Sequence, residues 1–313
     1  MRGTVVYVGQ RLILIAVTTA LVSSIVFVLL HQIPGNAFLN ETRQSPEALA
    51  AALRHYGLDR PLPAQYLDWV RGVLRGNLGE SLVNRGVQIT PLLIRETSVS
   101  ATVGLFALLV TVGLGLLLGV IAALRQNTWV DYVASSTAVV GYSIPSFVIA
   151  IFGLLIFGHY LYIWTQGTVY YDPGWGDWTQ VPVPAVALGL PYASYVARLT
   201  RASMLETIRN DYVRTAWAKG LSARIVVLRH ALRNALIPVV TILGPLITGI
   251  ITGSVVIENI FGIPGLGKEF VTSILARDYN IVIGVFTFYA ALVGLANLTV
   301  DVIYPLLDPR IRY

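Results

Sequence analysis

The chain has 313 residues, a formal net charge of +6 and a mean hydropathy of +0.70. Charged residues make up 12% of it, against roughly 25% in an average soluble domain, and hydrophobic residues make up 55%. So few charges cannot coat a water-facing surface of this size, which excludes an ordinary cytosolic enzyme, a disordered regulator and a nucleic-acid binder. The absence of cysteine excludes a disulfide framework, a thiolate metal site and a cysteine nucleophile.

The spacing of the charged residues predicts an all-α membrane protein. No Asp, Glu, Lys or Arg occurs in the windows 12–40, 97–124, 132–171, 178–197, 234–257 and 279–300. A helix needs about 20 residues to cross a hydrocarbon core of about 30 Å. We therefore predict six transmembrane helices, at about residues 12–31, 98–123, 134–158, 181–200, 236–257 and 281–304. The first window is longer than the apolar core of a signal peptide, so we expect this helix to be retained.

The distribution of Lys and Arg predicts the orientation and the domains. These residues gather before the first span, after the second, between the fourth and fifth, and after the last. All four places lie on one side of a six-span chain, so we expect both termini to be cytoplasmic. We then expect residues 1–31 to hold the N-terminus and first helix, 32–97 a small external domain with helices at 46–55 and 66–74, and 98–313 the core.

The cytoplasmic connection 198–237 predicts a rigid elbow. A helical pattern ends at Lys219 and Gly220, and glycine suits the left-handed conformation that ends helices. Ser222 can then cap a second helix over 223–235, and we expect Pro238 to open the next membrane helix. The apolar side chains that follow the turn either pack against the membrane part of the protein or dock on a cytoplasmic partner. The sequence leaves both alternatives open. The apolar residues in question are Leu221, Ile225, Val226 and Leu228.

Within the spans, Gly115-x3-Gly119 and Gly249-x3-Gly253 suit close helix packing, whereas Pro145 and Gly244-Pro245 predict kinks. Polar groups at or near the spans either join helices or line a solute path. Among them we take Tyr142, Ser143 and Asn297 as path candidates.

No catalytic constellation stands out. The four histidines are scattered, and neither H-E-x-x-H nor G-x-S-x-G occurs. Residues 262–268 fit G-x-x-x-x-G-K, but Glu269 stands where a P-loop needs Ser or Thr for magnesium. We therefore expect no catalytic residue, no metal site and no cofactor on this chain. Any ATP that powers it would act on another subunit.

Several segments together carry a family resemblance: YGLDRPLPAQY at 56–66, ARLTRASMLE at 197–206, DYVRTAWAKGL at 211–221, ENIFGIPGLG at 258–267 and LDPRIRY at 307–313. The chain resembles the membrane permease subunit of binding-protein-dependent ABC importers, and within them the B-type subunit of the dipeptide/oligopeptide/nickel branch. The resemblance implies the fold of a type I ABC importer permease.

The resemblance also implies a coupling site. The corresponding loop of the family carries E-A-A-x3-G and docks on an ATPase subunit; Gly220 and Ala216 fit this pattern, whereas Arg214 and Thr215 depart from it. The implied ATPase-coupling residues are Arg214, Thr215, Ala216, Gly220, Leu221, Ser222, Ala223 and Arg224. An external turn would form an outer gate or contact a binding protein through Glu258, Phe261, Pro264 and Gly265.

By the same resemblance, the chain is a non-catalytic subunit that moves a peptide by alternating access in a bacterial or archaeal plasma (inner) membrane. The implied partners are a second homologous permease in a heterodimer, two cytoplasmic ATPase subunits carrying ATP and magnesium, and an external solute-binding protein. Nickel, glutathione or an oligosaccharide are alternative cargoes. A self-sufficient secondary carrier is disfavoured, because intramembrane ionisable residues are nearly absent.

Overall fold

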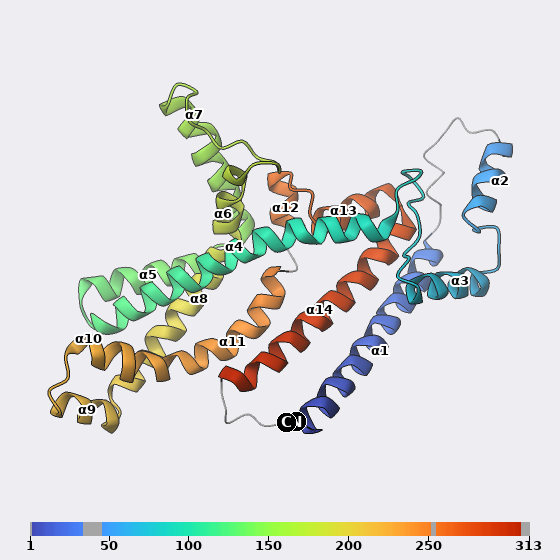
Figure 1. Cartoon of the computed structure of the whole chain (residues 1–313). Helices are drawn as coiled ribbons and strands as arrows, with labels where there is room; N and C mark the ends of the chain where they lie inside the picture. Colours follow the sequence, from blue (N-terminus) through green and yellow to red (C-terminus); the bar gives the residue numbers. More distant parts are fainter. Residues whose placement is uncertain (1, 34–45, 252–254, 308–313) are drawn as a thin grey trace. The chain divides into compact units, whose positions relative to one another are not determined.

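The computed structural model describes residues 2–33, 46–251 and 255–307. Within them all regular secondary structure is helical, apart from one isolated bridge between Glu80 and Gln88. The chain divides into two compact units, Met1–Val99 with Pro264–Ala296 and Ser100–Ile263 with Asn297–Tyr313. Two long helices, α4 (Ile89–Leu124) and α14 (Tyr279–Leu307), contribute residues to both units (Figure 1).

The first unit is built on the pair formed by α1 (Arg2–Gln32) and α14. The Ser23 and Thr287 hydroxyls hydrogen-bond at 2.8 Å, and Gly294 lets Ile15 pack directly against α14. The unit also holds α2 (Pro46–His55), α3 (Leu62–Leu74) and α13 (Leu266–Ala276). Its core consists of the buried residues Leu78, Ile89, Leu93, Leu266, Ile281 and Val285.

One buried carboxylate fixes the segment that precedes α4. Asp278 is 1% exposed and accepts hydrogen bonds from the Ser81 hydroxyl and from the backbone N–H groups of Leu82, Val83 and Ile281. The last of these bonds places Asp278 as a cap on α14. A buried charge is tolerated when hydrogen bonds satisfy it, so this cluster holds residues 81–83 against the start of α14.

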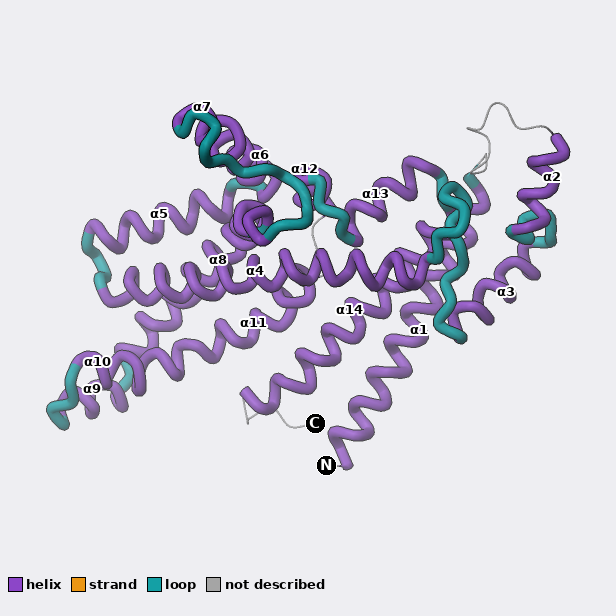
Figure 2. Tube along the Cα trace, turned by 45° about the horizontal axis from the view of Figure 1, so that its top comes forward, coloured by secondary structure: helices purple, strands orange, loops and turns teal. Residues whose placement is uncertain are grey.

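The second unit is arranged around α8 (Pro182–Ile208). Against it pack the second part of α4 and the helices α5 (Trp129–Ser143), α6 (Ser146–Gly153), α11 (Arg233–Ile251) and α12 (Val255–Phe261) (Figures 1 and 2). A projecting arm continues α6 through η2 (Leu154–Tyr160) and α7 (Leu161–Trp164), and the short helix η3 (Trp178–Gln180) leads into α8.

Glycine allows α4 to approach α8 closely, as predicted for Gly115 and Gly119. A Cβ at Gly119 would lie 2.5 Å from the Cβ of Thr200, and one at Gly115 would lie 2.7 Å from the Cβ of Val196. Real side chains never come this close, so both positions require glycine as long as the helices keep this distance. By contrast, a Cβ added at Gly249 would meet no atom of the described residues within 4 Å, and Gly253 lies outside the described residues.

In the described part of the chain, five helices are long and apolar enough to cross a membrane: Val6–Gln32, Ile89–Leu124, Ser146–Trp164, Ala223–Ile250 and Tyr279–Val302. They overlap five of the predicted spans, although Ser146–Trp164 and Ala223–Ile250 are shifted from the predicted 134–158 and 236–257. The span predicted at 181–200 lies within α8, which is not among the five. Helix α8 packs against several helices of its unit, and many of its buried residues are small or polar.

Three predicted features of the helices differ in detail. The kink predicted at Pro145 is an interruption: Ile144 is extended, as the residue before a proline prefers, and α6 starts at Ser146. Pro238 does not open a new helix but lies inside α11, which continues from residue 223 through the π-helical turn η4 (Val226–Leu232). The helix predicted at 66–74 starts at Leu62; that at 46–55 is confirmed, and its proposed cap Ser45 lies outside the described residues.

The α4–α8 contact gives a first prediction. Gly119→Leu should lower the stability of the protein by about 1–3 kcal/mol, because its side chain must displace Thr200 or separate the helices. The measurement is the thermal midpoint of the detergent-solubilised protein by size-exclusion chromatography. Gly113→Leu is the matched control, since Gly113 is exposed on the same helix with no neighbour within 4 Å. Equal midpoints for the two variants would contradict the packing.

Candidate functional site

The elbow predicted around Gly220 is present. Helix α9 (Asp211–Ala218) ends at Lys219, and Gly220 adopts a φ of 76°, a left-handed conformation that side chains disfavour. The Gly220 N–H donates to the Trp217 carbonyl at 3.0 Å, which closes the helix end. The next helix, α10 (Ala223–Ile225), starts after Ser222; the Ser222 carbonyl accepts from the Val226 N–H at 3.0 Å, but its hydroxyl makes no cap bond.

The elbow has a small core of its own. Val213, Ala216 and Val226 are buried together, and Leu221 packs against them. The Asn234 side-chain amide donates to the Tyr212 hydroxyl at 2.8 Å, which joins α9 to α11. A second cluster ties the elbow to its own unit through the buried residues Ala123, Met204, Ala231 and Ala235. Leu221 and Val226 therefore pack against the protein itself.

The other apolar side chains of the elbow face outward. Ile225 is 44% exposed and Leu228 is 51% exposed, and two aromatic residues of α9, Tyr212 and Trp217, are exposed as well. The same elbow carries exposed arginines at 214 and 224. One set of apolar residues therefore packs within the protein, and the other set leaves an apolar surface with basic neighbours.

The three predicted path residues lie on two helices. Tyr142 and Ser143 end α5 and are exposed, and the Ser143 hydroxyl donates to the Val139 carbonyl. Asn297 lies on α14, where its side-chain oxygen accepts a hydrogen bond from the Thr248 hydroxyl at 3.1 Å. Asn297 thus joins α14 to α11, while Tyr142 is partly exposed.

The turn over residues 258–265, which we predicted to act on the external side, contains both buried and exposed residues. Glu258 is 2% exposed and accepts a hydrogen bond from the Ser100 hydroxyl at 2.7 Å, and Phe261 is fully buried against Tyr171. Gly262 has a φ of 69°, as a tight turn requires, and Pro264 is exposed, whereas Gly265 is buried. The G-x-x-x-x-G-K stretch follows helix α12 and not a strand, so its glycines shape a turn.

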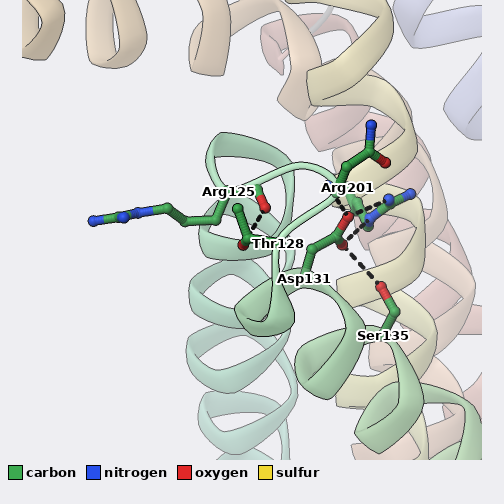
Figure 3. Close-up of polar contacts among 6 residues, drawn as sticks. Arg125, Thr128, Asp131, Ser135 and Arg201 are labelled. Atoms are coloured by element: carbon green, nitrogen blue, oxygen red, sulfur yellow. Dashed lines mark hydrogen bonds and ion pairs between the residues drawn. The ribbon is translucent and has the colours of Figure 1, made fainter.

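An ion pair that the sequence did not indicate joins α5 to α8 (Figure 3). Both nitrogens of an Arg201 fork reach the Asp131 carboxylate, at 2.6 and 2.7 Å, and Asp131 also accepts from the Asn127 N–H and the Ser135 hydroxyl. Asp131 is 2% exposed. The hydrogen bonds from Arg201 hold the pKa of the Asp131 carboxyl well below its usual range.

The sequence could not reveal this pair because its members are 70 residues apart. Asp131 directly precedes the charge-free window 132–171, whereas Arg201 lies four residues after the end of the window 178–197. The one feature of the sequence that could have drawn attention to this site is Asp131 itself. It is an acidic residue in the first turn of the apolar helix α5, where a negative charge also interacts favourably with the helix dipole.

The described residues hold no group of three or more His, Asp or Glu side chains that could bind a metal ion. The described part of the chain is a scaffold of helices with an elbow at the C-terminal end of α8.

Comparisons with known proteins place the chain in a family. Residues 115–313 match the family described as binding-protein-dependent transport system inner membrane component, and residues 5–90 match the N-terminal region of such membrane components. The chain belongs to this family. Together with the five apolar helices, this makes it a multi-pass membrane protein.

Named relatives are similar along nearly the whole chain. The dipeptide transport system permease protein DppB of Bacillus subtilis (strain 168) is 41% identical over 98% of this chain and 97% of that protein. The oligopeptide transport system permease protein OppB of Escherichia coli (strain K12) is 40% identical over 95% of both. The family resemblance inferred from the motifs is confirmed.

Solved structures support the same fold. A chain of the MetNI methionine ABC transporter, in an inward-facing conformation, is 18% identical; the match covers 69% of this chain and 96% of that chain, with a TM-score of 0.53. The fold of this protein is therefore similar to the fold of that chain.

The buried ion pair gives a second prediction. Asp131→Asn should lower the stability by about 2–3 kcal/mol, since it leaves the Arg201 charge without a partner while partial solvent access limits the loss. Because the folded pKa of Asp131 is depressed, the contribution of the pair is complete above about pH 4 and is lost as the pH falls further. The measurement is the thermal midpoint of the solubilised protein at neutral pH.

The matched control is Asp211→Asn, which removes an exposed pair with Arg214 at 3.7 Å and should change the stability by less than about 0.5 kcal/mol. A midpoint for Asp131→Asn that equals that of Asp211→Asn would show that the buried pair contributes nothing.

Proposed function

We propose that the chain is the transmembrane permease subunit of an ATP-driven peptide importer. The observation that carries this proposal is the similarity, at about 40% identity and nearly full length, to permeases of dipeptide and oligopeptide transport systems. In the proposal the chain is not catalytic, and ATP and magnesium act on separate ATPase subunits. The cargo moves by alternating access, in which the partners bind the two states of the permease with different affinity.

The elbow is the proposed contact with the ATPase. Its turn is rigid, because Gly220 is left-handed and Val213, Ala216 and Val226 form a core beneath it. The exposed side chains of Trp217, Ile225 and Leu228 supply apolar area for a partner, with basic residues beside it. In this proposal Arg214, Thr215, Ser222, Ala223 and Arg224 contact the ATPase, and Ala216, Gly220 and Leu221 hold the shape.

The proposed topology has six spans, with α8 as the fourth, and both termini in the cytoplasm of a bacterial or archaeal cell. The chain would form a heterodimer with a second homologous permease and receive cargo from an external solute-binding protein. Residues 32–97 form the external domain in this proposal. At the external turn, Pro264 offers the exposed contact, while Glu258, Phe261 and Gly265 hold the turn from within.

The Gly220 turn gives a prediction that tests coupling. Proline cannot adopt a φ of 76°, and a residue forced into a disfavoured conformation costs about 1–3 kcal/mol. Gly220→Pro should therefore reduce peptide uptake and peptide-stimulated ATPase activity of the assembled complex to about a tenth or less, with normal membrane insertion. Gly220→Asn is the matched variant, because asparagine tolerates the left-handed region and should retain most of the activity.

Wild-type uptake by an inserted Gly220→Pro protein would contradict the coupling role. The function itself is tested by expressing the chain with the second permease, ATPases and binding protein encoded beside it. Import of peptide that depends on ATP supports the proposal. Import of only nickel, glutathione or an oligosaccharide would change the cargo, and transport by the purified chain alone would identify a secondary carrier.

A further inference from the structure

Two arginines one turn apart on α8 have different surroundings. Arg201 is held by Asp131, as described above. Arg198 is exposed, and no carboxylate of the described residues lies within ion-pair distance of it. Its guanidinium carbon instead lies 4.5 Å from the centre of the Tyr142 ring. The Tyr142 ring is stacked with that of Tyr195, at 6.0 Å between centroids and 30° between planes.

Small residues hold these three side chains together. Ala138 and Gly141 of α5 and Ser194 and Ala197 of α8 are all buried, and a Cβ at Gly141 would overlap the Ser194 hydroxyl. Such residues let two helix backbones approach closely. The larger side chains that flank this contact, Tyr142, Tyr195 and Arg198, lie along its rim and form a site with two aromatic rings and one cation.

The two arginines reach in opposite directions along α5. Asp131 and Tyr142 are eleven residues apart, which is about 16 Å along a helix. Arg201 reaches toward the start of α5, the cytoplasmic end in the proposed topology. Arg198 reaches toward the N-terminus of α8, and so into the membrane. A charged side chain at that depth is costly unless it faces water or an anion.

The chemistry of the site selects a carboxylate. The guanidinium carbon of Arg198 lies over the Tyr142 ring, and no hydrogen bond from the guanidinium N–H groups to a described residue is present, so these donors stay available. A planar guanidinium matches a carboxylate through two parallel hydrogen bonds, and the tyrosine rings offer an apolar wall with polar edges. Every unmodified peptide ends in a carboxylate, whatever its sequence.

We infer that Arg198, with Tyr142 and Tyr195, forms a site for the C-terminal carboxylate of a peptide in transit. This inference rests on the proposed function and on Tyr142 lining the path. Binding a group that all peptides share gives an importer one constant contact, while the rings pack against variable side chains without selecting among them. A fixed cation within the membrane also offsets the cost of taking the peptide carboxylate out of water.

The experiment compares trialanine with trialanine amide on the purified complex without the external binding protein, by isothermal titration calorimetry. This arrangement removes selection by the binding protein. The wild-type complex should bind the free acid at least about tenfold more tightly than the amide, because a hydrogen bond between charged groups is lost. Arg198→Gln should bind both equally weakly, and Tyr142→Phe, which keeps the ring, should resemble the wild type.

The matched control is Arg125→Gln, which removes the same charge from an exposed position and should leave the discrimination unchanged. Equal binding of acid and amide by the wild type, or preserved discrimination in Arg198→Gln, would overturn the inference. The inference would also be overturned if the wild-type complex bound no trialanine at concentrations up to about 10 mM, because even a very weak site would be occupied there. Dissociation of the Arg198→Gln complex during size-exclusion chromatography would assign the arginine to contact with the second permease.

The inference and the proposed function fail in different ways. A wild-type complex that imports no peptide contradicts the proposed function. A wild-type complex that imports peptide, together with an Arg198→Gln complex that imports it equally well, contradicts only the carboxylate site.

Discussion

The second unit depends on the close approach of α8 to its neighbours. Glycines on α4 and α5, and alanines and a serine on α8, bring the backbones so near that a single added methyl group would overlap the facing helix. In a membrane this packing replaces the hydrophobic effect, because lipid chains are as apolar as the side chains they would cover. The elbow at the end of α8 and the tyrosines along it take their places from this contact.

The same contact explains how the unit distributes its few charges. The close approach of α5 and α8 brings Asp131 within reach of Arg201, and it leaves Arg198 against a tyrosine ring instead of a carboxylate. One arginine thereby serves the fold, since its charge is neutralised and its hydrogen bonds are made. The other keeps its charge and its donors, which makes it the more suitable of the two for binding an anion.

The elbow combines two properties that coupling requires. A partner can move a membrane helix only through a rigid connection, and the small core beneath Gly220 together with the bond from Asn234 to Tyr212 supplies this rigidity. The elbow must also expose apolar surface that a partner can cover, and the side chains of Trp217, Ile225 and Leu228 are exposed. In these short helices some residues face the core of the elbow and others face away from it, so one segment meets both requirements.

The sequence alone determined the class of the protein, its apolar spans, the glycine stop of the elbow and the family, because each of these follows from local composition, spacing or an ordered set of motifs. It also indicated Gly115 and Gly119 as packing positions. Only the tertiary structure paired Asp131 with Arg201, buried Glu258 against Ser100 and placed Arg198 over Tyr142. These contacts join residues far apart in the chain, and periodicity within one helix carries no information about which residue of another helix will face it. The structure also showed that the helix stops before Pro145 but continues through Pro238, a difference that the presence of a proline alone does not specify.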